Sequence, residues 1–145
     1  MTEQPLHGDL SQPLVLIGND QEWSSRSLES LLIPAGFRTA RAYTGSQVLQ
    51  LATSLMPDAV LIDRSLPDMS GAEVVELLRQ LPGFDPATPI VLLTTGTTSR
   101  AQRLEAHRAG AWDLLAEPWD VEALLLKLHL YVRARRSSPP LRQVG

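Results

Sequence analysis

Five short apolar runs, each followed by a segment with helical spacing, constrain the fold of this chain more than any other feature. The apolar runs span residues 14–17, 37–43, 59–63, 89–94 and 112–116. The helical segments span residues 21–35, 45–55, 72–81, 99–109 and 120–136. Short apolar runs between turn-forming residues are typical of strands buried on both faces. The alternation predicts an α/β fold, in which right-handed crossovers wind a parallel sheet with helices on both faces.

The length of 145 residues predicts one domain with a single core. We expect residues 1–12 to be a loose polar lead-in and residues 13–136 to form the domain. Residues 137–145 read SSPPLRQVG, which indicates a tail or the start of a linker.

Charge and composition exclude several classes of protein. The net charge of −3 offers no basic field for nucleic acid, and the absence of cysteine excludes disulfides and thiol chemistry. No apolar run reaches the ~20 residues that span a bilayer, and the N-terminus lacks a signal pattern. We therefore expect a cytoplasmic protein without direct nucleic-acid or membrane binding. Arg133, Arg135 and Arg136 cluster at the end of a helix, where we expect them to compensate the helix dipole.

Residues 57–71, PDAVLIDRSLPDMSG, carry the clearest functional signal. Their apolar run delivers the carboxylate of Asp63 to the end of a buried strand, and a Pro/Asp/Ser/Gly turn follows at once. In an open parallel sheet, ligands bind outside the carboxyl ends of the strands. Asp63 is therefore expected where chemistry would occur.

This segment resembles the phospho-acceptor segment of receiver domains, the response-regulator halves of two-component signalling systems. The strand PIVLLT (residues 89–94) and the ending AGAWDLLAEPWD (residues 109–120) are similar to further receiver markers, so the resemblance covers residues 13–136. It implies a flavodoxin-like, doubly wound sheet of five strands in the order 2-1-3-4-5, with the site above strands 1, 3 and 5. It also implies that Asp63 is the candidate phospho-acceptor.

Receiver domains hold Mg²⁺ between the acceptor and an acidic pair at the end of the first strand, and the resemblance puts Gly18 and Asn19 at that pair. Glycine offers no ligand and asparagine only a neutral oxygen, whereas Mg²⁺ affinity depends on carboxylates. Asp20 could join Asp63 as a weak metal ligand, but we favour it as the N-cap of the first helix. Ser65 would still offer its main-chain carbonyl. We expect weak Mg²⁺ binding at most, and no other cofactor.

The resemblance further implies a lysine before a proline at the end of strand 5, and this chain has Glu117 before Pro118. A carboxylate repels the aspartyl phosphate that a lysine would attract. Either Glu117 turns to solvent, or its charge makes one carboxyl of the pair with Asp63 titrate at a higher pH. The family has a cis peptide at this position, which an X-Pro bond permits.

Thr94 ends strand 4 where the family has its phosphate-sensing hydroxyl, although threonine is also an ordinary turn residue. The aromatic switch residue of the family lies three residues before the lysine, and that position is Leu114. The acceptor and the hydroxyl are thus kept, while the acidic pair, the lysine and the aromatic are replaced. The chain resembles an atypical receiver domain.

Receiver domains often signal through the face made by helix 4, strand 5 and helix 5, commonly as dimers. In the last helix, Leu126 and Leu130 lie four residues apart, outside the expected core stripe. Beside Trp112 or Trp119 they would form a patch for a second copy or a partner. The alternative is that they belong to a broad buried face. Trp23 either covers the metal pocket or packs on the first helix, and we favour packing.

Two functions remain open from the sequence. One is a receiver domain that a histidine kinase or phosphotransfer protein phosphorylates on Asp63. The other is a receiver-like module that acts through protein contacts, with weak or absent phosphorylation, and we favour the second. We do not expect an enzyme, because the sequence has no nucleophile–base pair, Gly-rich phosphate loop or histidine cluster.

Overall fold

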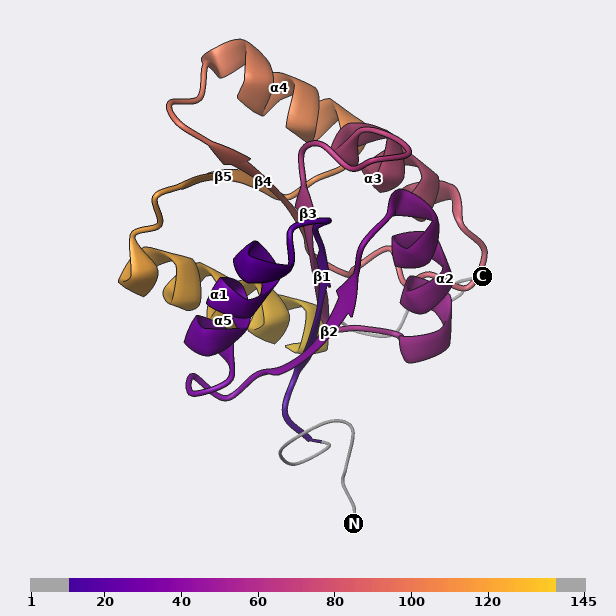
Figure 1. Cartoon of the computed structure of the whole chain (residues 1–145). Coiled ribbons are helices and arrows are strands. Elements are labelled where there is room, and N and C mark those ends of the chain that lie inside the picture. Colours follow the sequence, from indigo (N-terminus) through magenta and orange to yellow (C-terminus); the bar gives the residue numbers. More distant parts are fainter. Residues whose placement is uncertain (1–10, 138–145) are drawn as a thin grey trace.

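The computed structural model describes residues 11–137 as a five-stranded parallel sheet flanked by five helices (Figure 1). The strand order is β2-β1-β3-β4-β5, as the resemblance implied. The strands are β1 (Leu14–Gly18), β2 (Arg38–Ala42), β3 (Ala59–Asp63), β4 (Ile90–Thr95) and β5 (Asp113–Glu117). The helices are α1 (Glu22–Leu32), α2 (Gly45–Leu55), α3 (Gly71–Gln80), α4 (Arg100–Ala109) and α5 (Val121–Ser137). Most of the expected lead-in and tail lies outside the described residues.

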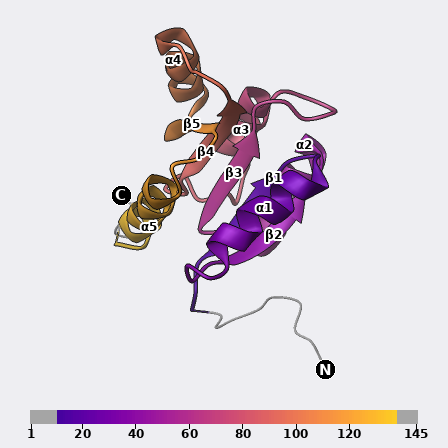
Figure 2. The ribbon, with the colours of Figure 1, turned by 60° about the vertical axis from the view of Figure 1, so that its left-hand side comes forward.

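The helices cover both faces of the sheet, with α1 and α5 on one face and α2, α3 and α4 on the other (Figures 1 and 2). Successive strand residues point to opposite faces, so each strand supplies both cores. In β3, for example, Val60 and Ile62 join the core under α2, α3 and α4, whereas Ala59 and Leu61 join the core under α1 and α5. This double burial explains why the strands read as continuous apolar runs.

Local capping fixes where most helices begin. Ser70 and Ser99 form capping boxes with the residues three positions later, at the starts of α3 and α4. The side chain of Thr44 accepts a hydrogen bond at the start of α2. The expected N-cap at Asp20 is wrong, because α1 begins at Glu22 with its N-cap one residue before, and no side chain caps it.

The leucines of α5 fall into a buried set and an exposed set, as expected. Leu124, Leu128 and Val132 are buried under the sheet, whereas Leu126 and Leu130 are 60% and 49% exposed. The alternative of a broad buried face is therefore wrong for this pair.

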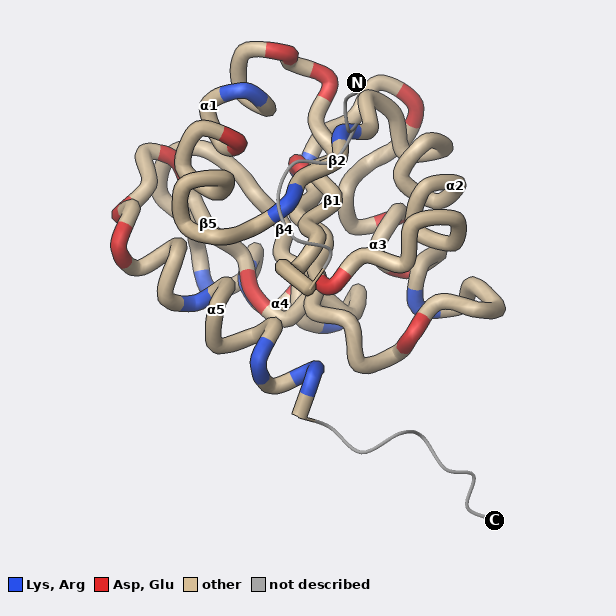
Figure 3. The backbone as a smooth tube through the Cα atoms, turned by 90° about the horizontal axis from the view of Figure 1, so that it is seen from below, with Lys and Arg blue, Asp and Glu red and all other residues tan. Residues whose placement is uncertain are grey.

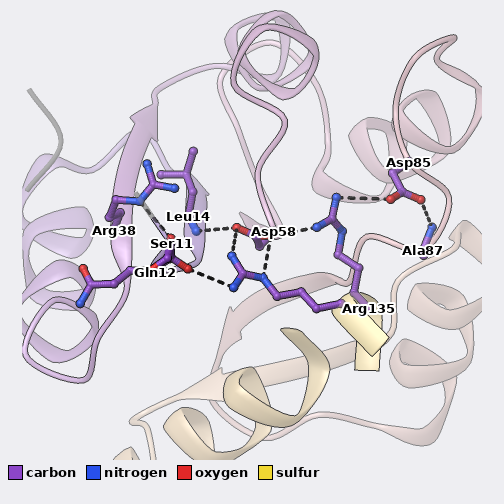
Figure 4. A network of polar contacts seen from close by, with 9 residues as sticks. Ser11, Gln12, Leu14, Arg38, Asp58, Asp85, Ala87 and Arg135 are labelled. Atoms are coloured by element: carbon purple, nitrogen blue, oxygen red, sulfur yellow. Dashed lines mark hydrogen bonds and ion pairs between the residues drawn. The ribbon is translucent and has the colours of Figure 1, made fainter. Parts of the chain in front are cut away.

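The amino end of the sheet is held by a charged cluster around Asp58, which precedes β3 (Figure 4). The Oδ1 atom of Asp58 accepts hydrogen bonds from Arg135 Nη1 (2.8 Å) and Arg136 Nε (3.3 Å). Its Oδ2 atom accepts from the main-chain nitrogen of Leu14 (2.8 Å) and from Arg136 Nη2 (3.3 Å). Arg135 also reaches Asp85 at 3.3 Å. Both arginines lie in the last turn of α5, as expected, and they also bind acidic side chains there.

Arg136 extends this cluster to the start of the described chain, since its Nη1 donates to the carbonyl of Ser11 at 3.0 Å. Figure 3, seen from below, shows the basic residues at the end of α5 in blue. The cluster therefore ties the end of α5 to the amino ends of β1 and β3, at the opposite end of the strands from Asp63.

Candidate functional site

The register of the parallel strands brings the predicted site residues to one edge of the sheet. Gly18 pairs with Ile62, so Asn19 and Asp63 follow side by side on neighbouring strands. On the other side, Asp63 pairs with Leu93 of β4, whose next residue is Thr94. Thr94 and Thr95 pair with Ala116 and Glu117 of β5. The carboxyl ends of β1, β3, β4 and β5 therefore lie together at one edge of the sheet, where the topology places the acceptor site.

The carboxylate of Asp63 is half-buried and receives one main-chain hydrogen bond, from the nitrogen of Ser65 to Oδ2 at 3.0 Å. Burial raises the pKa of Asp63, and the negative charges of Asp20 and Glu117 raise it further, against the lowering effect of the Ser65 bond. The raised pKa of Asp63 agrees with the alternative in which a carboxyl of this pair titrates at a higher pH, although burial is the larger cause and Glu117 the smaller. The pocket is thus acidic.

Gly18 does not belong to this pocket. A Cβ atom at position 18 would lie 2.6 Å from Cγ2 of Val48, a buried residue of α2. The side-chain direction at this position points into the core, so the expectation that Gly18 is a pocket residue is wrong. The residues that follow β1 beside Asp63 are Asn19 and Asp20.

Asn19 and Asp20 differ in what they offer to the pocket. Asn19 is 6% exposed, and its Oδ1 accepts a hydrogen bond from the nitrogen of Gln21 at 2.8 Å. This bond uses one of the two lone pairs of the amide oxygen, which is neutral and therefore a weaker ligand for a metal ion than a carboxylate. Asp20 is exposed, and its charge acts on Asp63. Asp20 is therefore the carboxylate on the β1 side of the acceptor.

The donor set suits a weakly held hard cation. Among the described residues, no three His, Cys, Asp or Glu side chains are grouped closely enough to hold a metal ion. Mg²⁺ binds oxygen ligands and usually keeps several waters, so one or two carboxylates can suffice when a phosphate also binds. Asp63, Asp20 and the main-chain carbonyl of Ser65 would supply these oxygens.

The loop after Asp63 is anchored by a residue that the sequence reasoning missed. The carboxylate of Asp68 accepts hydrogen bonds from the nitrogens of Gly45 (2.7 Å) and Ser46 (3.0 Å), at the start of α2. These two bonds hold the pKa of Asp68 below its usual range. At the loop's other end, a Cβ at position 71 would collide with the main-chain oxygen of Asp63. Glycine at 71 thus allows α3 to begin directly against the acceptor residue.

The hydroxyl, switch and cis-peptide positions that the resemblance implied lie on β4 and at β5. Thr94 is half-buried one residue beyond the partner of Asp63. Leu114 is 9% exposed and packs in the core under α4. The peptide bond between Glu117 and Pro118 is cis, as the resemblance implied.

The comparison with known proteins agrees with this geometry. Residues 15–129 match the family model of the response regulator receiver domain. The chain belongs to this family. It is 34% identical over 130 residues to the transcriptional regulatory protein KdpE of Mycobacterium tuberculosis, a match that covers 90% of this chain and 55% of that protein. This receiver domain therefore spans about half the length of that curated relative.

Solved structures support the same fold. The chemotaxis protein CheY4 of Vibrio cholerae matches the receiver domain with a TM-score of 0.76 at 29% identity, covering 83% of this chain and 99% of that one. A CheY-like response regulator receiver domain protein from Methanospirillum hungatei matches with a TM-score of 0.77 at 25% identity, covering 87% and 98%. Within its described residues, the receiver domain has no helix that could cross a membrane.

The expected interaction face is partly exposed. Leu126 and Leu130 lie on the outer side of α5, and Trp112 is 39% exposed before β5. The Trp112 ring packs edge-on against the ring of Tyr131, with 5.5 Å between centroids. Trp119, in contrast, is half-buried against the core of α1 and α5.

Trp23 lies on α1, two residues beyond its N-cap. It is 66% exposed, so the expectation that it packs on the first helix is wrong.

Proposed function

We propose that this receiver domain acts in two-component signalling mainly through protein contacts, with weak Mg²⁺-dependent phosphorylation at Asp63. The observation that carries this proposal is the carboxylate of Glu117, which acts on Asp63 from the position where the family has a lysine. A phosphoryl group adds about two negative charges to the acceptor. Asp20 and Glu117 would repel these charges, and none of the groups found to shift the pKa of Asp63 is a cation.

Weak metal binding supports the same proposal. Asn19 offers only a neutral amide oxygen, which already accepts a hydrogen bond from Gln21, so Asp63 and Asp20 are the carboxylates available to Mg²⁺. Asp63 and Asp20 would hold Mg²⁺ there, and the ion would supply positive charge to offset the phosphoryl group. The chain's own contribution is to hold Asp63 by the Ser65 nitrogen and to present Thr94 beside it.

The second candidate is an ordinary phospho-acceptor that a histidine kinase or phosphotransfer protein phosphorylates. In that reaction an oxygen of Asp63 attacks the phosphorus of a phosphohistidine, the phosphorus–nitrogen bond breaks, and the imidazole leaves with that electron pair. Asp20 favours this candidate, because it keeps one carboxylate of the acidic pair beside the acceptor.

The output of either function would pass through partners. Leu126, Leu130 and Trp112 are exposed apolar residues of the α4/β5/α5 face, and they suit a second copy of this chain or another signalling protein. We propose no enzymatic activity and no direct contact with nucleic acid for this domain.

The deciding experiment measures Mg²⁺-dependent binding of beryllofluoride, a phosphoryl mimic, by NMR of the amides of Ser65 and Thr94. Wild type, Asp63→Ala and Glu117→Lys are compared at equal protein concentration. The proposal predicts a weak response in wild type, none in Asp63→Ala, and at least a tenfold tighter response in Glu117→Lys, since this change replaces repulsion by attraction. Tight, saturable binding by wild type, unchanged by Glu117→Lys, would instead establish the ordinary phospho-acceptor.

A further inference from the structure

A cavity of about 140 Å³ lies beside the acceptor loop, between α3, α4 and the sheet. Its apolar walls come from four elements, with one residue from each. Leu92 of β4 and Leu114 of β5 are paired in register and form the sheet side. Ala72 of α3 and Ala106 of α4 form the helix side. Both helix residues that line the cavity, Ala72 and Ala106, are alanines, and larger side chains at these positions would fill the space.

The size of this cavity matches one aromatic ring. An apolar cavity of about 150 Å³ can take up benzene from water. Leu92, Ala106 and Leu114 are each less than 10% exposed, so the side of a ring that lies against them would be removed from water, while its other side would meet the polar rim.

The rim of the cavity is polar and nearly balanced in charge. Arg64 and Glu105 both line it and are exposed, which places one cation and one anion at the opening. Gln102 also lines it, and its Oε1 already accepts a hydrogen bond from the Ser99 nitrogen at 2.8 Å. A carboxylate or ammonium group on a ligand would attract one of the two rim charges and repel the other. A neutral hydroxyl can donate to Glu105 and accept from Arg64.

We propose that this cavity is a binding site for a small molecule with a single aromatic ring and a neutral hydrogen-bonding substituent, such as a phenol. The site is separate from the acceptor pocket but touches the same loop. Arg64 directly follows Asp63, and its nitrogen donates to the carbonyl of Leu93 at 2.8 Å. A bound ligand would therefore contact both the acceptor loop and α4.

The test is a titration of the whole chain with phenol, followed by the amide signals in ¹H–¹⁵N NMR spectra. The expected result is saturable shifts at Ala72, Leu92, Ala106 and Leu114, with a dissociation constant of about 1 mM, because so few ligand atoms bind weakly. Shifts that do not saturate by about 10 mM, or that spread over the surface without favouring these residues, would overturn the proposal.

Two variants that fill the cavity make the test specific. Ala106→Leu should weaken phenol binding at least tenfold, and Ala101→Leu is its matched control, since Ala101 is an exposed residue of the same helix outside the cavity. Leu114→Phe fills the cavity from the sheet side and serves if Ala106→Leu does not fold. Unchanged affinity in a folded cavity-filling variant would place phenol elsewhere and contradict the proposal.

Discussion

Removal of the Asp58 carboxylate should destabilise this receiver domain far more than removal of a surface charge. The Asp58 side chain is 12% exposed and accepts four hydrogen bonds, from Arg135, twice from Arg136 and from the Leu14 nitrogen. Asp58→Ala would leave Arg135, itself 18% exposed, with only the longer contact to Asp85. It would also leave the buried Leu14 nitrogen without an acceptor.

Breaking a buried ion pair from one side typically costs about 3–5 kcal/mol, because the remaining charge stays buried and uncompensated. The entropy of unfolding is about 2.1 cal/mol/K per residue, or about 0.3 kcal/mol/K for the 145 residues of this chain. The two values together predict that Asp58→Ala lowers the midpoint of thermal unfolding by roughly 10–16 °C.

The assay is thermal unfolding at pH 7, followed by circular dichroism, for wild type, Asp58→Ala and Glu22→Ala. Glu22 is the matched control, because its side chain is 63% exposed and its ion pairs with Arg26 and Arg41 measure 3.7 and 3.8 Å. Exposed pairs of this kind contribute about 0–1 kcal/mol, so its midpoint should fall by no more than about 3 °C. Equal shifts in the two variants would refute the reasoning that the Asp58 cluster is a buried anchor.

Three further predictions concern the acceptor and the output face. The pKa of Asp63 is higher in the folded than in the unfolded protein, so its ionised carboxylate destabilises the fold at neutral pH. This destabilisation decreases as the pH falls through the folded-state pKa toward the pKa of the unfolded chain. Asp63→Asn should therefore raise the thermal midpoint at pH 7, with the gap to wild type shrinking toward pH 4; a constant gap would contradict the burial argument. Gly71→Ala should destabilise the domain by about 1–3 kcal/mol and shift the Ser65 amide signal, since the new Cβ collides with the Asp63 oxygen; an unmoved Ser65 signal in NMR spectra would count against this contact. If the α4/β5/α5 face pairs two copies, Leu126→Ser combined with Leu130→Ser should shift sedimentation toward the monomer, while these exposed positions leave stability within about 0.5 kcal/mol.

The order and type of the elements were predictable because each strand is apolar on both faces and each is bounded by turn-forming residues. The ends were less predictable, because pairing decides where a strand begins. Phe37 is apolar and is predicted to begin the second strand, yet β2 begins at Arg38. The Phe37 side chain is buried under α1 and α5, and its nitrogen bonds the Leu32 carbonyl at the end of α1.

The positions of Asp63, Thr94 and Glu117 were predictable because each follows or ends an apolar strand. The geometry around Gly18 was not, because the side-chain direction in a strand reverses at every residue. A resemblance that is displaced by one residue therefore exchanges a core position for a pocket position. In this chain the displacement assigns Gly18 to the acceptor site, although position 18 faces Val48 in the core. The residue whose charge acts on Asp63 is Asp20.

The sequence does not single out Asp58 or Asp68, although both lie in residues 57–71, the segment with the clearest functional signal. Their partners are distant in sequence, 78 residues away for Arg136 and 23 for Gly45. Only the fold brings such groups together, so no local pattern could distinguish these two anchors from ordinary surface acids.

Asp58 and Asp63 lie at opposite ends of β3 and differ in the charges that surround them. This difference distinguishes a structural aspartate from a candidate functional one. Asp58, just before the strand, accepts hydrogen bonds from two arginines and a main-chain nitrogen, so its charge is paired in the folded protein. Asp63, at the end of the strand, meets one main-chain nitrogen and two like charges, so its ionised form is disfavoured. A fold gains nothing in stability from an acid held in this way. Among the described residues, no cation contributes to the pKa shift of Asp63, so its ionised form would be favoured by a bound cation or by a partner that supplies positive charge.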